Sequence, residues 1–255
     1  MSEGFLITAS REPQFYQAAL HCADSIRDHY PEAKICVFTH SDWACEQLEL
    51  LADTIVHPIP NHVRAKLWAL PRSPYDRTVY VDAGVFCVHD DVQKIFEIEK
   101  DAPLLMTENR AYCSKVVYFT PTEEIHHRKG PELHKQGKCE RLRWHWGLFR
   151  YDTEVTRQLI YDWLATLKRH HEGHTEPYAP SSMAFWDTYA FWRCFKEKDY
   201  GFEPQMFPSP DARWQYISGH YKEEELEGQE PVFEHYSIPM QLRTVSGNGS
   251  FAEWK

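Results

Sequence analysis

The 255-residue sequence lacks the features that mark several common classes of protein. Its seven cysteines include no Cys-x-x-Cys pair, and an odd number leaves at least one thiol unpaired, so neither a disulfide framework nor a zinc ribbon is indicated. No run of 18 apolar residues occurs, and the opening MSEGFLITAS lacks the basic and apolar regions of a secretion signal. We therefore expect a cytoplasmic protein in a reducing compartment, with no membrane partner.

Positive charge is also scarce, because 28 Lys and Arg stand against 38 Asp and Glu, for a net charge of -10. This balance argues against a broad nucleic-acid surface, whose affinity comes from neutralising phosphates, although a local basic groove stays open. The sequence has no P-loop, no Gly-x-Gly-x-x-Gly fingerprint and no Gly-x-Ser-x-Gly elbow. P-loop nucleotide hydrolysis, Rossmann-type dinucleotide binding and serine hydrolase chemistry therefore lose support.

Aromatic residues are abundant, at 15% of the chain. Such rings either fill a core or form flat platforms for sugar rings and bases. Most of them lie in strongly apolar segments, which favours the core.

Apolar runs and segments of helical spacing alternate through the first half of the chain. Runs at residues 5–9, 33–39, 54–59 and 78–82 predict strands, and segments after residues 13 and 41 and over 62–70 predict helices. This alternation predicts an α/β fold with a mostly parallel central sheet and helices on both faces.

The second half is less regular. Strands are predicted at 104–106, 116–120 and 144–151, and helices from 153 to about 170 and from 181 or 182 to 195. Residues 121–141 are polar and without a period, so we expect a long surface loop that is mobile and closes over a ligand.

The most informative residue is Asp82, because it ends the apolar run TVYV. That position puts its carboxylate at the carboxyl edge of the sheet, where open α/β folds bind ligands, although a turn-forming aspartate would also fit there. We predict that Asp82 faces a cleft shared with residues 8–11.

The surrounding order of residues resembles the donor-site region of GT-A glycosyltransferases, particularly the glycogenin-like families. Lys66 precedes a Pro-Tyr-Asp turn, the strand closes on Asp82-Ala83, and a helix with Asp91, Val92 and Phe96 follows. The resemblance covers residues 1–100. It implies a single GT-A domain over 1–255, with 1–100 as the nucleotide-sugar half and 101–255 as the acceptor-side half.

The same resemblance implies a glycosyltransferase that moves a hexose from a nucleotide-diphosphate sugar, of the UDP type, to a hydroxyl on a glycan, protein or small molecule. A non-catalytic nucleotide-sugar or glycan-binding protein with this fold is the alternative. A nucleic-acid acceptor is disfavoured by the net charge and not excluded. The donor-binding residues it implies are Thr8, Ala9, Ser10, Arg11, Arg64, Lys66, Asp82 and Gly84.

One departure from the family concerns the metal. The family's Asp-x-Asp signature holds Mn²⁺ or Mg²⁺ with both carboxylates, and Gly84 stands where the second would be. Losing a carboxylate lowers the charge and the ligand count offered to a hard ion. His235 resembles the family's C-terminal histidine ligand, so we expect Asp82 and His235 to hold a weak or dispensable ion. Asp90 and Asp91 are expected to cap the helix from Val92 instead.

Residues 144–147 (WHWG) resemble the family's Asn-x-Gly strand on the acceptor side, with His145 in place of the Asn, and the resemblance implies acceptor contacts at His145, Trp146 and Gly147, where the glycine would let a sugar approach the backbone closely. A paired core histidine is the alternative for His145. Asp187 is the expected catalytic residue, as a general base in an inverting enzyme or as a holder of an acceptor hydroxyl in a retaining one. An ordinary carboxylate on a helix surface is the alternative for Asp187.

Overall fold

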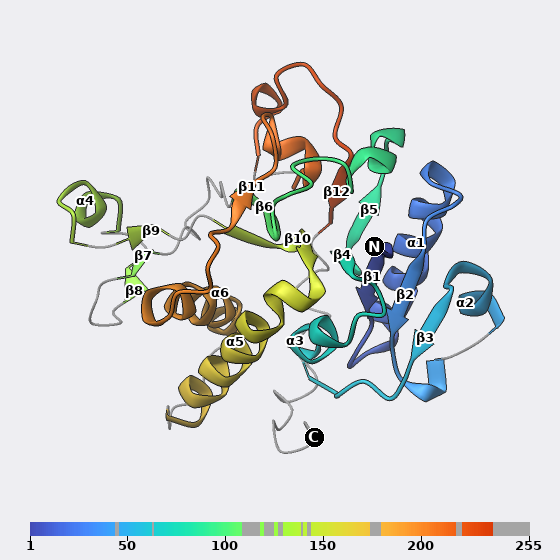
Figure 1. Ribbon diagram of the computed structural model, residues 1–255, viewed down its shortest axis with the longest axis horizontal. Helices are drawn as coiled ribbons and strands as arrows, with labels where there is room; N and C mark the ends of the chain where they lie inside the picture. Colours follow the sequence, from blue (N-terminus) through green and yellow to red (C-terminus); the bar gives the residue numbers. More distant parts are fainter. Residues whose placement is uncertain are drawn as a thin grey trace.

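The computed structural model describes residues 1–43, 46–62, 64–108, 118–119, 125–126, 130–138, 140–141, 144–173, 180–217 and 221–236. Within these residues a seven-stranded sheet has the strand order β11-β6-β10-β4-β1-β2-β3 (Figure 1). Its strands are β1 (Glu3–Thr8), β2 (Ile35–Phe38), β3 (Thr54–Val56), β4 (Arg77–Asp82), β6 (Leu104–Glu108), β10 (Trp144–Asp152) and β11 (Gln205–Met206).

The sheet is mostly parallel, as predicted. β1 pairs in parallel with β2 and β4, β2 with β3, and β6 with β11, whereas β10 is antiparallel to both β4 and β6. The strands β1 and β2 are apolar and buried on both faces, which is typical of a sheet covered by helices on each side. The same sheet runs through both halves of the sequence.

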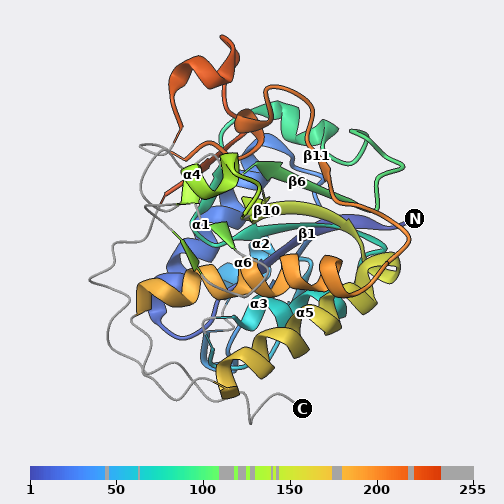
Figure 2. The ribbon, with the colours of Figure 1, turned by 90° about the vertical axis from the view of Figure 1, so that its left-hand side faces the viewer.

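Strand side chains alternate between the two faces of the sheet, and helices cover both faces. Phe5 and Ile7 pack with α1 (Pro13–His29) and α2 (Glu46–Leu51), whereas Leu6 faces the opposite core. That second core is covered by α3 (Ala65–Ala69), α5 (Thr153–Gly173) and α6 (Pro180–Glu197). Figure 2 shows α5 and α6 lying beneath β6 and β10.

The remaining described elements are short. A two-stranded ribbon joins β5 (Val85–Cys87) to β12 (Phe233–His235), and a small sheet joins β7 (Tyr118–Phe119) to β8 (Ile125–His126) and β9 (Glu140–Arg141). The 3₁₀ helices are η1 (Ser41–Trp43), η2 (Leu70–Arg72), η3 (Asp90–Lys94), η4 (Asp211–Trp214) and η5 (Glu223–Leu226).

The expectation of a structureless loop over 121–141 is wrong for its described residues, which contain β8, α4 (Gly130–Lys135) and β9. The two-residue strands are too short to show an alternating pattern, so they could not be predicted from hydrophobic periodicity. The rest of that stretch lies outside the described residues, and its mobility stays a prediction.

The expected caps of the helix after β5 are also corrected. His89 is the capping residue, since its Nδ1 accepts a hydrogen bond from Asp91 N at 3.0 Å. Asp91 instead pairs with Lys94 and Arg213, at 2.6 and 2.8 Å. Hydrogen bonds from these two cations lower the pKa of Asp91 to about 2. An imidazole nitrogen can therefore take the place of a capping carboxylate.

Two further expectations concern compartment and membrane. The four cysteines whose surroundings are described, Cys22, Cys36, Cys87 and Cys194, are buried free thiols. In the described part of the chain, no helix combines the length and apolarity that crossing a membrane requires.

Candidate functional site

The candidate site lies at the carboxyl ends of β1 and β4, where the order of strands reverses. The chain runs outward from β1 to β2 and β3, then crosses back through α3 to β4 on the other side of β1. Open α/β sheets bind ligands at such a switch point. Thr8 and Asp82 are direct partners in the β1–β4 register, so Asp82 lies beside the start of the 8–11 segment, and a cleft shared by these residues stays a prediction.

Asp82 is held in place by two neighbours. Its Oδ1 accepts a hydrogen bond from Tyr80 Oη at 2.6 Å and lies 3.7 Å from Lys66 Nζ. Burial, together with the adjacent carboxylate, raises the pKa of Tyr80, so its phenol remains a hydrogen-bond donor. Thr8 Oγ1 lies 3.0 Å from Tyr80 Oη and can donate to it in turn. The sequence analysis missed Tyr80, although a residue two before Asp82 on a strand shares its face.

Lys66 brings a fixed positive charge to this site. Its side chain is 8% exposed, and its ammonium donates to Trp146 O at 3.2 Å and lies 5.5 Å from the centre of the Tyr80 ring. The Trp146 ring, by contrast, packs on Trp163 and Phe191 in the core. What Trp146 provides here is its backbone carbonyl, so an acceptor-side contact by its ring is not supported.

Arg64 and Asp187 form a buried ion pair beside α3. Arg64 Nη1 lies 3.0 Å from Asp187 Oδ2, with side chains 12% and 3% exposed. The alternative that Asp187 is an ordinary surface carboxylate is therefore wrong. A guanidinium already paired with a carboxylate is less available to other anions, so this pairing competes with any phosphate for Arg64.

The expected first-strand residues are placed at the end of β1. Ala9 is fully buried and its backbone N donates to Phe38 O at 2.9 Å, while Ser10 Oγ donates to His62 O at 3.1 Å. Arg11 has a φ of 78°, in the left-handed region, which turns the chain sharply before α1. Donor binding by these residues stays a prediction.

Two histidines meet at a glutamine that the sequence analysis missed. Gln215, fully buried after η4, has Oε1 2.8 Å from His145 Nδ1 and Nε2 3.1 Å from His235 Nδ1. The imidazoles lie nearly perpendicular, 5.7 Å apart. Burial, followed by the nearby His235, lowers the pKa of His145 to about 3, so His145 carries no charge near neutral pH.

Both glycines expected at the site are explained by close packing. A Cβ on Gly147 would lie 2.1 Å from Gln215 Nε2, so the close approach at Gly147 is made by a side chain of this protein rather than by a sugar. A Cβ on Gly84 would lie 2.8 Å from the Tyr236 carbonyl oxygen and 3.9 Å from His235 Nε2. Tyr236 N also donates to Gly84 O at 2.9 Å. The space beside Gly84 is therefore filled by the backbone after β12.

These donors do not fit a divalent ion held mainly by the protein. The described residues contain no cluster of three or more His, Cys, Asp or Glu side chains able to hold a metal. Of the expected ligands, Asp82 already has an ammonium 3.7 Å from its Oδ1. Mn²⁺ and Mg²⁺ favour several oxygen ligands, so Asp82 and His235 are a poor set for either ion.

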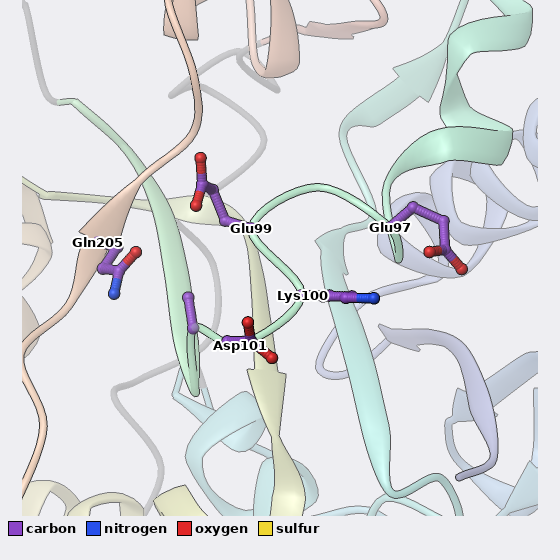
Figure 3. Close-up of a pocket in the computed structure, with 6 residues that line it drawn as sticks. Glu97, Glu99, Lys100, Asp101 and Gln205 are labelled. Carbon is purple, nitrogen blue, oxygen red and sulfur yellow. The ribbon is translucent and has the colours of Figure 1, made fainter.

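A polar hollow at the opposite edge of the sheet is a poor alternative site. It is lined by Glu97, Glu99, Lys100, Asp101, Ala102 and Gln205. Figure 3 shows the three carboxylates pointing away from one another, so they do not converge on a ligand. The hollow borders the amino end of β4, where Arg77 donates to Lys100 O at 2.6 Å.

Several solved glycosyltransferases share this fold. Apo WbbM, a bifunctional glycosyltransferase, is 12% identical with a TM-score of 0.58, over 93% of this chain and 46% of that one. The galactosyltransferase LgtC, solved with donor and acceptor sugar analogues, is 12% identical with a TM-score of 0.55, over 92% of this chain and 87% of that one. GlyE from Streptococcus pneumoniae is 12% identical with a TM-score of 0.57, over 92% of this chain and 55% of that one.

The chain thus spans about half the length of the WbbM and GlyE chains that it matches. No protein family and no curated protein matches it in sequence. At 12% identity the likeness shows the fold, which is the GT-A fold of these glycosyltransferases.

Proposed function

We propose that this chain is a glycosyltransferase that moves a hexose from a nucleoside-diphosphate sugar of the UDP class to a hydroxyl acceptor. The observation that carries the proposal is the Asp82–Lys66 pair at the switch point between β1 and β4 of a GT-A fold. A carboxylate and an ammonium side by side at that edge suit a ligand that has both hydroxyls and phosphates.

Lys66 would neutralise the departing diphosphate. Its ammonium is 8% exposed and held by Trp146 O and the Tyr80 ring, so little reorganisation accompanies the growth of negative charge on the leaving group. Preorganised charge of this kind is the largest electrostatic contribution that a site can offer to such a transition state. No step of this reaction is assigned to a metal ion, because the donor set fits one poorly.

Asp82 would bind the donor sugar. Both contacts that the described residues make with its carboxylate fall on Oδ1. Oδ2 is therefore the oxygen that can accept a hydrogen bond from a sugar hydroxyl. Tyr80 fixes the carboxylate through Oδ1, and the Thr8 hydroxyl behind it completes a short chain of hydrogen bonds to the end of β1.

Asp187 suits the acceptor side of a retaining reaction better than a general base. Its buried pairing with Arg64 fixes the carboxylate in place, and a carboxylate oxygen holds a hydroxyl by accepting its hydrogen bond. A general base in an inverting reaction would take that proton fully and weaken the pairing with Arg64, so the ion pair favours the retaining role.

Donor hydrolysis is the direct test. UDP release from UDP-hexoses would be measured with added Mn²⁺ and with a chelator, for wild type, Lys66→Met and Asp82→Asn. We expect wild-type turnover in both buffers and a loss of at least ~100-fold in each variant, of the size seen when one transition-state donor is removed. Asp53→Asn is the matched control, since Asp53 also pairs with cations but lies at the amino end of β3.

A nucleotide-sugar or glycan-binding protein without activity is the second candidate. The observation in its favour is Gly84, whose neighbourhood is filled by Tyr236 where the family has a second carboxylate. Calorimetric binding of a UDP-sugar that is neither hydrolysed nor transferred would establish this candidate. Turnover that is equal in wild type and in both site variants would refute the proposed site.

A further inference from the structure

Gln215 connects three strands around the candidate site. Its amide contacts Thr107 Oγ1 of β6 at 2.9 Å, His145 Nδ1 of β10 at 2.8 Å and His235 Nδ1 of β12 at 3.1 Å. Its neighbour Tyr216 pairs with β12 through the backbone, donating to Phe233 O and accepting from His235 N. The side chain is fully buried, so each of its donors and acceptors must be matched inside the protein.

A backbone N–H determines whether His145 Nδ1 is protonated. Gly147 N donates to His145 Nδ1 at 3.2 Å, so this nitrogen is an acceptor and carries no proton. The same contact recurs elsewhere in the chain: His62 Nδ1 accepts from Arg64 N at 2.9 Å, and His89 Nδ1 from Asp91 N at 3.0 Å. A histidine that accepts from the backbone N two residues on is thus a repeated local feature of this fold.

An unprotonated His145 Nδ1 requires a donor from Gln215. With Oε1 toward His145, two acceptors would face each other at 2.8 Å. Protonating Nδ1 instead would set its hydrogen against that of Gly147 N. Turning the amide by 180° about its last bond exchanges Oε1 and Nε2 and leaves every other atom in place. The amide nitrogen then donates to His145 and to the Thr107 oxygen, whose hydroxyl hydrogen is free to rotate.

This orientation fixes the second imidazole as well. The Gln215 oxygen now lies against His235 Nδ1, so that nitrogen must carry the proton in order to donate. A neutral imidazole has one protonated nitrogen, and the partner of one nitrogen decides the state of the other. The lone pair of His235 is therefore on Nε2, the atom 3.9 Å from the Cβ position of Gly84.

We infer that Gln215 is a positioning residue that sets opposite tautomers on the two histidines, with the proton of His145 on Nε2 and that of His235 on Nδ1. The inference deepens the proposed function and rests on it for its catalytic meaning. In this tautomer His235 Nε2 accepts hydrogen bonds and cannot donate one to a phosphate. Neutralisation of the diphosphate then falls to Lys66.

Nitrogen chemical shifts of the imidazoles test this directly. Two-bond ¹H–¹⁵N correlations on the ¹⁵N-histidine-labelled full chain distinguish protonated from unprotonated ring nitrogens, and His145→Gln and His235→Gln assign the two rings. At pH 8.5, above the ordinary histidine pKa of about 6.5, we expect Nε2–H for His145 and Nδ1–H for His235. A proton on His235 Nε2, on both of its nitrogens, or in an even mixture would overturn the inference.

Two variants separate positioning from packing. In Gln215→Glu the carboxylate still accepts from His235 Nδ1–H, so His235 should keep its tautomer while His145 loses its donor. In Gln215→Met both partners are lost, and both rings should become mixtures. A Gln215→Glu protein in which His235 changes and His145 does not would support the opposite amide orientation and refute ours.

The activity readout keeps the two proposals distinguishable. The tautomers are measured without donor or turnover, so a chain that fails to hydrolyse UDP-sugars can still show them. If wild type turns over, Gln215→Met should lower the rate by about 10-fold to 100-fold, as is typical when a partner that orients a functional histidine is lost. Loss of that size with unchanged tautomers would refute the positioning role alone.

Discussion

Replacing Gly147 with alanine would place a methyl group 2.1 Å from the Gln215 side-chain amide, at the atom that faces His235. Glycine is not needed at this position for its backbone freedom, because the described glycines with positive φ are Gly137, Gly201 and Gly228. Gly147→Ala is therefore a steric test. It asks whether the buried amide of Gln215 is what excludes a side chain here.

The magnitude follows from two opposing contributions. Forcing a methyl group into a packed site costs about 1–3 kcal/mol. Alanine at a compatible backbone position returns about 0.4–1 kcal/mol, because the unfolded chain loses freedom. These ranges leave a net loss of about 0–2.6 kcal/mol, and the 2.1 Å approach places Gly147→Ala in the upper part, at about 1–2 kcal/mol of unfolding free energy.

A double-mutant cycle identifies the cause. With Gln215→Ala the nearest atom is gone, and the next contacts of the added Cβ are His235 Nδ1 at 3.0 Å and His145 Cε1 at 3.1 Å. Gly147→Ala should then cost little, so the coupling should be about 1–2 kcal/mol, within the range for residues in contact. The assay is urea unfolding of the four proteins, compared at equal slope m.

The control and the refutation are both quantitative. Gln229 is an exposed glutamine, so Gly147→Ala and Gln229→Ala should be additive within about 0.5 kcal/mol. Additivity of that kind between Gly147→Ala and Gln215→Ala would show that Gln215 does not explain the glycine.

Three further predictions concern the metal, the buried ion pair and acid stability. Calorimetry should show that Gly84→Asp binds Mn²⁺ no more tightly than wild type, because its Cβ would lie 2.8 Å from a backbone carbonyl. Gly84→Asp and Gly84→Ala should both lower the free energy of unfolding by about 1–3 kcal/mol for the same reason. Tighter Mn²⁺ binding by Gly84→Asp would show that a carboxylate is simply missing. Asp187→Ala should lower the free energy of unfolding in urea by about 3–5 kcal/mol, because it removes the carboxylate that pairs with the buried Arg64. The double variant Arg64→Met with Asp187→Leu should recover most of that loss, and no recovery would contradict this account. The pKa of Asp91 is lowered to about 2, so its pairs stabilise the fold above the unfolded pKa of about 3.9 and stop doing so as the pH falls toward 2. Arg213→Gln should therefore lose less stability over that interval, by about 1 kcal/mol, and acid unfolding curves identical to wild type would refute the assignment.

The part of the site that could be predicted lies on continuous stretches of chain. The run TVYV is apolar because β4 is buried on both faces, and Asp82 is polar because the strand reaches the sheet edge there. That one contrast locates the switch point. Lys66 was predicted from the resemblance to the GT-A donor-site region, because it lies on the helix that precedes this strand.

The rest could not be predicted because it depends on contacts between distant residues. Gln215 and Thr107 are 108 residues apart, and nothing around Gln215 in the sequence distinguishes it from a surface glutamine. The burial of Asp187 could not be predicted either, because its partner Arg64 lies at the start of a different helix, α3. Gly84 was identified because it lacks a carboxylate. The reason for the glycine is the backbone of Tyr236, more than a hundred residues later in the sequence.

The position of β4 also has a consequence for the local stability of the two sides of the site. β4 is paired on both sides, with β1 and with β10, whereas β12 pairs with β5 in a separate ribbon outside the main sheet. Amide hydrogens in β4 should exchange with solvent through global unfolding, and those of β12 through smaller local openings. Asp82 then lies on the rigid side of the site. The β5–β12 ribbon, which carries His235, is the element whose amide exchange should slow when a nucleotide-sugar binds.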